Sequence, residues 1–190
     1  MTKSNLRKRY KQLRKALTFS ERETAAQTIA EHLAIIIPDG AVVHCFLPIK
    51  NLFEVDTFII INALTNLKPD IRWASSISDF DSLTMPCYAL DLNNISNNAY
   101  NIPEPAEPLS KIDPNSIDFV ITPLLVCDSK GYRVGYGKGF YDRFFATISP
   151  TCKKIGVNYF PPLQHTIDIN AFDIALNMHA SPEGITTFTP

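Results

Sequence analysis

A strand–helix–strand pattern between residues 41 and 75 constrains the fold of this chain more than any other feature. AVVHCF (41–46) is a continuous apolar run with the length of a buried strand, and IRWAS (71–75) is a second strand candidate. Between them, DTFIIINALTNL (56–67) has the length and composition of a helix. Strands joined by such a crossover lie parallel in one sheet, which helices then cover. The segment therefore predicts an α/β fold with a mostly parallel central sheet.

Two helices are predicted before this unit. Residues 3–17 carry an apolar stripe at helical spacing, formed by Leu6, Tyr10, Leu13 and Leu17. The segment is rich in basic residues and contains no acid, a composition that most often marks a solvated helix face. Along one edge of the stripe lie Lys3, Arg7 and Arg14. The second helix is predicted to begin at Ser20, with Glu23 completing a capping box, and to end at Pro38.

The remaining elements follow after a long polar segment. Residues 75–116 are rich in Pro and Asn and are expected to cross the surface, with only MPCYAL (85–90) resembling a strand. DFVITPLLV (118–126) is the most strand-like run of the chain. A short helix is predicted at 140–148 and a further strand at 153–159, after which the sequence shows no clear periodicity.

Length and composition limit the classes of protein to consider. A chain of 190 residues with 45% hydrophobic and 19% charged residues is expected to form one globular domain spanning 1–190. Its net charge of −1 provides no overall basic field for nucleic acid. No apolar run approaches the roughly 18 residues of a membrane span, and no signal-peptide core follows the basic N-terminus. We therefore expect a cytoplasmic protein without a membrane partner, whose four widely spaced cysteines are reduced thiols.

The segment GYRVGYGKGFYDRFF (131–145) concentrates four of the seven glycines among basic and aromatic residues. Glycine lets a ligand approach the backbone closely, at a cost in chain entropy. The spacing excludes both the P-loop and the dinucleotide-binding fingerprint. Free backbone amides before a short helix, together with Arg133 and Lys138, nevertheless favour a phosphate ligand, and Asp142 is placed to hold the accompanying metal ion.

A second interpretation of the same loop is open at this point. The sequence Lys138-Gly139-Phe140 begins like an RNA-binding octamer, although Tyr141 and Asp142 then break that pattern. An RNA-binding module that uses the basic N-terminal helix and the aromatic, glycine-rich loop is therefore an alternative.

The sequence resembles the 5-formyltetrahydrofolate cyclo-ligase family, also called methenyltetrahydrofolate synthetases. G-x-R-x-G-Y-G-K-G-F-Y-D-R is similar to the family signature, and similar companion motifs are KSNLR, LPIKNLFEVDT, YNIPEP, DFVITP and FDIALN. The chain departs from the family pattern at LLVC (124–127) and at Phe172, where His is customary. The usual Gln before the late motif is either replaced by Pro162 or displaced to Gln164. The resemblance implies a single-domain, three-layer α/β sandwich with a mostly parallel central sheet flanked by helices.

The resemblance also implies an activity. Family members convert 5-formyltetrahydrofolate to 5,10-methenyltetrahydrofolate with ATP and Mg²⁺, by phosphorylating the formyl oxygen and closing the ring, and they release ADP and phosphate. Small molecules are then the expected partners, without nucleic acid, and the chain is expected to be a monomer or a homodimer. An ATP-dependent enzyme of the same fold with a different substrate is a further alternative.

Site residues follow from the resemblance by position. The catalytic residues would be Lys138, Arg133 and Tyr141. ATP would be bound by Lys3, Arg7, Arg133, Val134, Gly135, Tyr136, Gly137, Lys138, Gly139, Phe140 and Tyr141. The folate would be bound by Leu47, Glu54, Tyr100, Tyr136, Lys138, Gly139 and Phe140. Asp142 and Asp173 would hold the metal, and we assign Trp73, Phe144 and Phe145 to the core.

Overall fold

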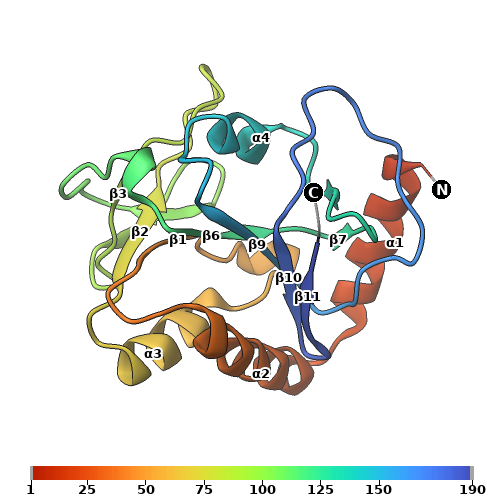
Figure 1. The fold of residues 1–190 in the computed structure, drawn as a ribbon, viewed down its shortest axis with the longest axis horizontal. Helices are drawn as coiled ribbons and strands as arrows, with labels where there is room; N and C mark the ends of the chain where they lie inside the picture. Colours follow the sequence, from red (N-terminus) through yellow and green to blue (C-terminus); the bar gives the residue numbers. More distant parts are fainter. Residues whose placement is uncertain (1, 189–190) are drawn as a thin grey trace.

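A seven-stranded sheet in the order β11-β10-β9-β6-β1-β2-β3 forms the centre of the computed structural model, which describes residues 2–188 (Figure 1). Its strands are β1 (Val42–Cys45), β2 (Arg72–Ser76), β3 (Cys87–Ala89), β6 (Phe119–Pro123), β9 (Lys153–Val157), β10 (Met178–Ser181) and β11 (Gly184–Thr187). The five strands from β10 to β2 run parallel to their neighbours, and β3 and β11 are antiparallel edges. The predicted mostly parallel sheet is confirmed.

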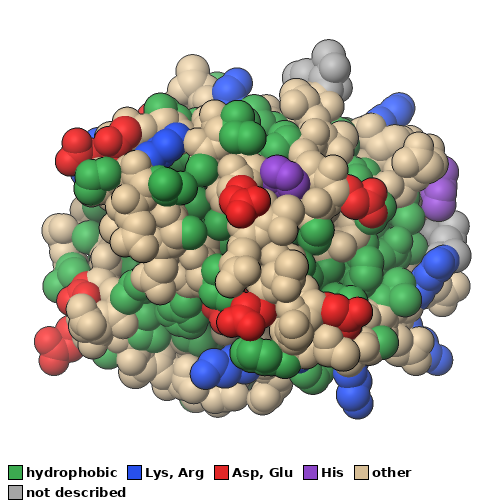
Figure 2. All heavy atoms as spheres, turned by 90° about the horizontal axis from the view of Figure 1, so that it is seen from below, with side chains coloured by type: hydrophobic (Ala, Val, Ile, Leu, Met, Phe, Trp, Pro, Cys, Tyr) green, Lys and Arg blue, Asp and Glu red, His purple; other side chains and the backbone are tan. Residues whose placement is uncertain are grey.

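Helices flank the sheet on both faces. They are α1 (Lys3–Ala16), α2 (Phe19–Ile36), α3 (Thr57–Leu67) and the short α4 (Phe140–Phe145). In Figure 1, α2 and α3 lie together below the sheet, α4 lies above it, and α1 stands beside the sheet next to β7. Acidic and basic side chains are scattered among uncharged ones on the side where α2 and α3 lie (Figure 2). The three-layer α/β arrangement inferred from the resemblance is confirmed.

Smaller elements complete the chain. Two hairpins lie outside the main sheet, and two single turns of 3-10 helix connect longer elements. They are β4 (Ile95–Asn97) with β5 (Pro103–Pro105), β7 (Val126–Cys127) with β8 (Arg133–Val134), η1 (Lys50–Leu52) and η2 (Pro114–Ser116). No helix among residues 2–188 combines the length and apolarity needed to cross a membrane.

Strand β1 shows why the apolar run 41–46 identifies the centre of the sheet. Val43 and Cys45 are buried in the cluster that α2 and α3 close, whereas Val42 is buried in the cluster that includes Phe144 of α4. A strand covered on both faces by helices needs apolar residues at every position rather than at alternate ones. This is why β1 lacks the alternation of a half-exposed strand.

The start of α2 lies earlier than predicted, and a different pair of residues forms its capping box. Thr18 is the N-cap, and its capping box is completed by Glu21 rather than by the predicted pair Ser20 and Glu23. The sequence TFSERE contains two overlapping candidates for this motif. Thr18 keeps an extended backbone while Ser20 already lies inside the helix, so the earlier candidate is the one used.

The buried face of α1 also differs from the predicted apolar stripe. Leu6 and Tyr10 are buried as expected, but Leu13 is 38% exposed. Arg14, only 1% exposed, occupies the buried position instead. A guanidinium group can be buried when its donors find acceptors, and the two terminal nitrogens of Arg14 find them in Leu124, Leu52 and Tyr136. The Arg14 Nε has no acceptor among residues 2–188.

The second half of the chain differs from the prediction in two places. The run 118–126 is broken after Pro123, and its end forms β7, which pairs with β8 outside the main sheet. The tail contains the unpredicted strands β10 and β11. These strands have only four residues each, and their place in the sheet depends on pairing rather than on apolar periodicity.

The residues assigned to the core are mostly found there. Phe144 and Phe145 are buried, whereas Trp73 is only partly buried and donates through its indole N–H to Thr65. The side chains of Cys45, Cys87, Cys127 and Cys152 are buried, free thiols, as expected from their spacing.

Candidate active site

A cavity of about 1160 Å³ opens beyond the carboxyl ends of β1, β2 and β6. Its walls are formed by α1, by the loops that follow these strands, by the glycine-rich loop with the start of α4, and by the segment 170–174. The crevice outside the carboxyl ends of parallel strands is where open α/β sheets bind ligands. A volume at the upper end for small-molecule sites leaves room for more than one ligand.

The glycine-rich loop is held against α1 by its own backbone. Gly137 and Gly139 have φ values of +92° and +72°, which side chains rarely adopt. The Arg7 Nε donates to the carbonyl of Gly135 at 2.9 Å, and a Cβ on Gly137 would lie 3.4 Å from an Arg7 nitrogen. The contact with Arg7 would leave room for a Cβ, so it is the positive φ that favours glycine at 137. Lys138 is exposed between the two glycines.

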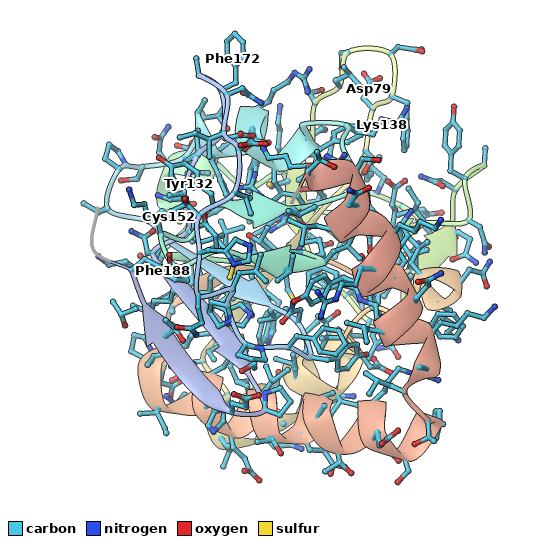
Figure 3. All side chains as sticks on the ribbon, turned by 90° about the vertical axis from the view of Figure 1, so that its right-hand side faces the viewer. Asp79, Tyr132, Lys138, Cys152, Phe172 and Phe188 are labelled. Atoms are coloured by element: carbon cyan, nitrogen blue, oxygen red, sulfur yellow. The ribbon has the colours of Figure 1, made fainter. Side chains whose placement is uncertain are left out.

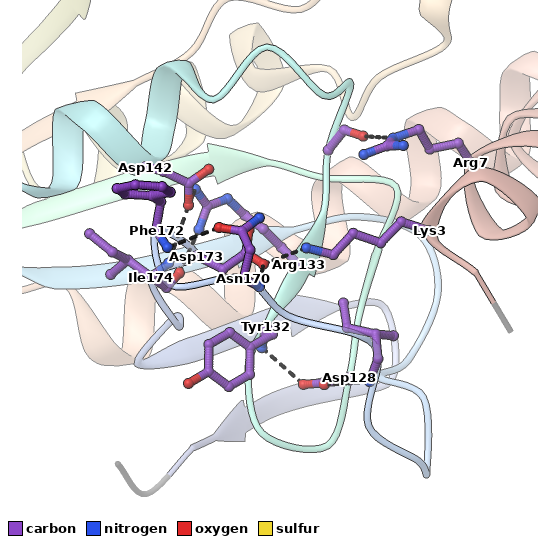
Figure 4. A network of polar contacts seen from close by, with 12 residues as sticks. Lys3, Arg7, Asp128, Tyr132, Arg133, Asp142, Asn170, Phe172, Asp173 and Ile174 are labelled. Carbon is purple, nitrogen blue, oxygen red and sulfur yellow. Dashed lines mark hydrogen bonds and ion pairs between the residues drawn. The ribbon is translucent and has the colours of Figure 1, made fainter.

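Asp128 shapes the turn that leads into this loop, and the sequence patterns did not identify it. Its side chain is fully buried and accepts the backbone N–H groups of Lys130 and Tyr132, both at 2.9 Å (Figure 4). Its second oxygen accepts the N–H of Ile167 at 2.9 Å. Asp128 thus fixes the hairpin of β7 and β8, which carries Arg133.

Four residues, Lys3, Arg133, Asp142 and Asp173, form what we call the ion-pair region of the cavity. The Lys3 Nζ lies 2.5 Å from Asp173, and Arg133 lies 2.7 Å from Asp142 (Figure 4). The backbone of Ile174 closes the group, because its carbonyl accepts from Arg133 and its N–H donates to Asp142. Residues from α1, β8, α4 and the loop between β9 and β10 (158–177), which we call the late loop, therefore meet.

Charge is retained throughout the ion-pair region. Burial acts to raise the pKa of Asp173, but hydrogen bonds from Lys3 and from the backbone of Asn170 outweigh it, so the pKa lies below its usual value. Burial lowers the pKa of Arg133, and the neighbouring Asp142 opposes that shift. The region thus holds two cations and two carboxylates that neutralise one another.

The two carboxylates suit a metal ion that is also held by phosphate. Asp142 and Asp173 each use one oxygen for the contacts above, and each second oxygen forms no hydrogen bond within residues 2–188. Their side chains are 24% and 17% exposed. No group of three or more metal-ligating side chains occurs among the described residues. This donor set fits Mg²⁺, which binds one or two carboxylates and takes its other ligands from phosphate and water.

Arg14, Tyr136 and Glu54 form a second polar group, which we call the Glu54 region. Glu54 is only 7% exposed, and it accepts the Tyr136 hydroxyl at 2.6 Å and the Ile49 N–H at 2.8 Å. Burial raises the pKa of Glu54, although these hydrogen bonds and the charge of Arg14 oppose the shift. Glu54 lines the cavity together with the buried Leu47.

Aromatic side chains form another wall. The ring centroids of Phe80 and Tyr100 are 4.2 Å apart, and Phe80 lies edge-on to Phe140 at 5.2 Å. All three line the cavity, and Tyr100 is 64% exposed. This surface suits a flat ring system.

Tyr141 lines the cavity from α4 and packs against Phe144 and Phe145. Its hydroxyl forms no hydrogen bond with the described residues, and burial raises its pKa well above the usual value. The phenol therefore stays protonated at neutral pH. It can donate a hydrogen bond to a ligand but cannot act as a base.

One predicted site residue faces elsewhere. The side chain of Val134 is fully buried in a hydrophobic cluster with Leu6 and Tyr10, away from the cavity. Strand β8 places alternate side chains on opposite faces, so Arg133 faces the cavity and Val134 faces the core. This corrects the expectation for its side chain. Every other predicted site residue lines the cavity.

Lys11, His44 and Ser76 are among the cavity residues that the sequence analysis did not predict. Lys11 lies one turn after Arg7 on α1, and this helical spacing was a usable signal. His44 and Ser76 lie on neighbouring strands and share a hydrogen bond of 2.8 Å. Burial lowers the pKa of His44 to about 3, so its imidazole is neutral. Only the register of β1 and β2 brings these two residues together, and no local pattern reports it.

Comparisons with known proteins agree with this geometry. The profile of the 5-formyltetrahydrofolate cyclo-ligase family matches residues 1–173. The 5-formyltetrahydrofolate cyclo-ligase of Mycoplasma pneumoniae is 28% identical over 169 residues, which cover 84% of this chain and 86% of that protein.

Two solved structures share the fold. The 5,10-methenyltetrahydrofolate synthetase of Aquifex aeolicus superposes with a TM-score of 0.80 at 24% identity, covering 100% of this chain and 94% of that one. The 5,10-methenyltetrahydrofolate synthetase of Mycoplasma pneumoniae superposes with a TM-score of 0.74 at 23% identity, covering 96% of this chain and 99% of that one.

Proposed function

The chain belongs to the 5-formyltetrahydrofolate cyclo-ligase family, an enzyme family, and on this basis we propose that it converts 5-formyltetrahydrofolate to 5,10-methenyltetrahydrofolate with ATP and Mg²⁺, releasing ADP and phosphate. The observation that carries the proposal is that one cavity is lined by both the ion-pair region and Glu54. We also infer that residues 1–190 act as one domain, because Lys3 and Asp173 from opposite ends of the chain meet in that cavity.

The chemistry explains why such a cavity needs concentrated positive charge. Ring closure must expel the formyl oxygen, which is a very poor leaving group as hydroxide. Transfer of the γ-phosphoryl group breaks its bond to ADP and forms a bond to the formyl oxygen. The second folate nitrogen then attacks the activated carbon and loses its proton, and the C–O bond breaks to release phosphate. Phosphoryl transfer asks a protein mainly to position the reactants and to cancel charge.

Cations from three parts of the chain supply that charge in the proposal. Lys3 and Arg7 come from α1, Arg133 from β8 and Lys138 from the loop, and all line the cavity. Lys138 is exposed and forms no side-chain bond to the described residues, so its ammonium is available to a phosphate oxygen. The phosphates would replace Asp142 and Asp173 as partners of Arg133 and Lys3.

Mg²⁺ would be held by the second oxygens of Asp142 and Asp173, and it would neutralise phosphate charge. The contact of Asp142 with the Ile174 N–H keeps this carboxylate turned toward the late loop, at 3.2 Å. One carboxylate ligand of the metal would therefore come from α4 and the other from the segment 170–174.

The folate would occupy the remaining part of the cavity. Glu54 would accept ring N–H groups of the pterin, and Leu47 would pack against its ring. Tyr100 and Phe140 would stack on the flat parts of the substrate. Tyr141, which stays protonated, would donate a hydrogen bond to an oxygen of the reacting groups.

The contacts of the loop's aromatic rings favour this proposal over the RNA-binding alternative. Base stacking on RNA needs rings that are open to solvent. Tyr136 and Phe140 are instead half-buried cavity residues, engaged by Glu54 and Phe80.

The decisive experiment mixes the protein with 5-formyltetrahydrofolate and Mg-ATP and follows the near-ultraviolet absorbance of the methenyl product. Product should form with one ADP per turnover, and it should not form when ATP is omitted or when EDTA is added. Absence of product from a folded preparation that binds ATP would overturn the assignment. Tight RNA binding with a steep salt dependence would then favour the alternative.

A further inference from the structure

Arg14 is a buried cation without a direct carboxylate partner among residues 2–188. Its side chain lies in the last turn of α1 and is 1% exposed. One terminal nitrogen donates to the Tyr136 hydroxyl at 2.9 Å and to the Leu52 carbonyl at 3.4 Å. The other donates to the Leu124 carbonyl. Burying an unpaired charge is costly, so this arrangement calls for a reason.

The chemistry of the donors fixes where the proton of Tyr136 points. A guanidinium group only donates hydrogen bonds, so the Tyr136 oxygen must accept from Arg14. The single phenolic proton is then directed at Glu54 Oε1, 2.6 Å away. The other oxygen, Oε2, accepts the Ile49 N–H at 2.8 Å. Both oxygens of Glu54 therefore already accept a proton donor, an arrangement that favours the ionised carboxylate.

We propose that Arg14 is a positioning residue for the substrate, which acts through the Tyr136 hydroxyl to hold Glu54 as a fixed, ionised acceptor on the cavity wall. The inference rests on the proposed function, because it assumes that Glu54 receives the N–H groups of the folate. Arg14 itself does not line the cavity. The positive charge of Arg14 and the negative charge of Glu54 lie on either side of the Tyr136 hydroxyl.

Two further observations support this role. Burial raises the pKa of Glu54, and the hydrogen bond from Tyr136 and the charge of Arg14 are among the factors that oppose the rise. The same three side chains join α1, the loop after β1 and the glycine-rich loop. The same buried hydrogen bonds thus hold both Glu54 and the glycine-rich loop in place.

The first test measures binding rather than turnover. Tyr136→Phe removes only the hydroxyl, so Glu54 loses one donor and Arg14 loses one acceptor. We expect the Kd for 5-formyltetrahydrofolate, measured by titration calorimetry without nucleotide, to rise about ten- to hundredfold, the usual effect of losing a hydrogen bond to a charged group. A wild-type folate Kd in Tyr136→Phe would overturn the proposal.

The second test asks whether Arg14 acts through Tyr136. Arg14→Lys keeps the charge but loses the forked geometry, and it should weaken folate binding in the wild-type background. In the Tyr136→Phe background the same substitution should weaken it no further, because the link to Glu54 is already broken. Additive effects would mean that Arg14 only supports the fold, and they would overturn the proposal.

Controls separate failure of this inference from failure of the proposed function. Arg9→Lys, on the exposed face of the same helix, should leave the folate Kd unchanged. Circular dichroism and thermal melts check folding, and Tyr136→Phe carries the test alone if Arg14→Lys does not fold. If the wild-type protein binds no 5-formyltetrahydrofolate, the proposed function fails with the inference. If it binds and the variants do not respond as described, only the inference fails.

Discussion

The two polar regions of the cavity are built in opposite ways. In the ion-pair region, Lys3 contacts Asp173 at 2.5 Å and Arg133 contacts Asp142 at 2.7 Å, and three of the four side chains are 17–24% exposed. In the Glu54 region no charged pair is in direct contact, Arg14 and Glu54 are 1% and 7% exposed, and the Tyr136 hydroxyl separates them. The ion-pair region is thus neutralised by direct contacts and is partly open to water. The Glu54 region is buried, and its two charges are connected through a hydroxyl group.

This difference indicates what each region does when ligands arrive. Charges that are paired at the edge of solvent can exchange partners, because a phosphate can replace a carboxylate at Lys3 and a metal ion can replace Lys3 at Asp173. Buried hydrogen bonds to a carboxylate are costly to break, so the Glu54 region is suited to present a fixed acceptor. We therefore expect substitutions in the two regions to affect different ligands.

The largest effect is expected at Lys138, which belongs to neither region and whose side chain has no bonding partner among residues 2–188. Lys138→Ala should reduce kcat by about 10²–10³, the usual cost of removing a group that stabilises charge in the transition state. The thermal midpoint should not change, because the side chain is exposed. In Figure 3, Lys138 lies at the same end of the molecule as the outward-pointing Phe172. Near-normal turnover by folded Lys138→Ala would remove it from the mechanism.

The cations of α1 test the exchange of partners. Lys3→Ala and Arg7→Ala should each lower kcat/KM for ATP about ten- to hundredfold, which corresponds to about 1.5–3 kcal/mol for a hydrogen bond to a charged group. The Kd for 5-formyltetrahydrofolate should not change. Lys8→Ala and Lys15→Ala, on exposed faces of the same helix, serve as controls. Equal behaviour of all four variants would mean that α1 presents only a solvated basic face.

Asp142 tests the metal side of the same region. Asp142→Asn should raise the Mg²⁺ concentration for half-maximal rate by up to about tenfold, because a neutral amide is a weaker ligand for a hard cation. It also leaves Arg133 without its charged partner, so melting curves should be recorded in parallel. Asp168→Asn, exposed on the late loop and outside the cavity lining, is the matched control. An unchanged Mg²⁺ titration would assign Asp142 to structure alone.

The sequence predicted the layers of the fold better than the supports of the site. A continuous apolar run such as 41–46 indicates a strand that is buried on both faces of the sheet. Local patterns of this kind were therefore enough to predict the parallel sheet. The residue-by-residue resemblance brought Lys3, Arg133, Asp142 and Asp173 to one place, and the ion pairs agree with it.

Local sequence patterns could not predict the buried contacts of other residues. The position of Arg14 on the edge of the apolar stripe does not predict its burial, because that burial depends on carbonyls of Leu52 and Leu124 that are distant in sequence. The burial of Asp128 also depends on distant contacts, because its side chain accepts N–H groups both from its own turn and from Ile167. Such contacts are set by tertiary structure, and a residue type alone does not report them.

The smallest effect is expected in the stability of the ion-pair region. The pKa of Asp173 lies below its usual value, so its pairing stabilises the fold above the unfolded-state pKa of about 3.9 and loses this contribution as the pH falls through the lower, folded-state value. Both side chains are partly exposed, and the pair is expected to contribute about 0.5–1 kcal/mol.

Lys3→Ala should therefore lower the thermal midpoint by about 1–4 °C at pH 7, and the difference from the wild type should disappear toward about pH 2. Tyr136→Phe, in the buried Glu54 region, should lower the midpoint more, because it takes one hydrogen-bond acceptor from the buried Arg14 and one donor from the buried Glu54. Lys8→Ala should match the wild type at every pH. A deficit in Lys3→Ala that persisted in acid would mean that Lys3 stabilises the protein by packing rather than by its charge, and the contrast between the two regions would then not hold for stability.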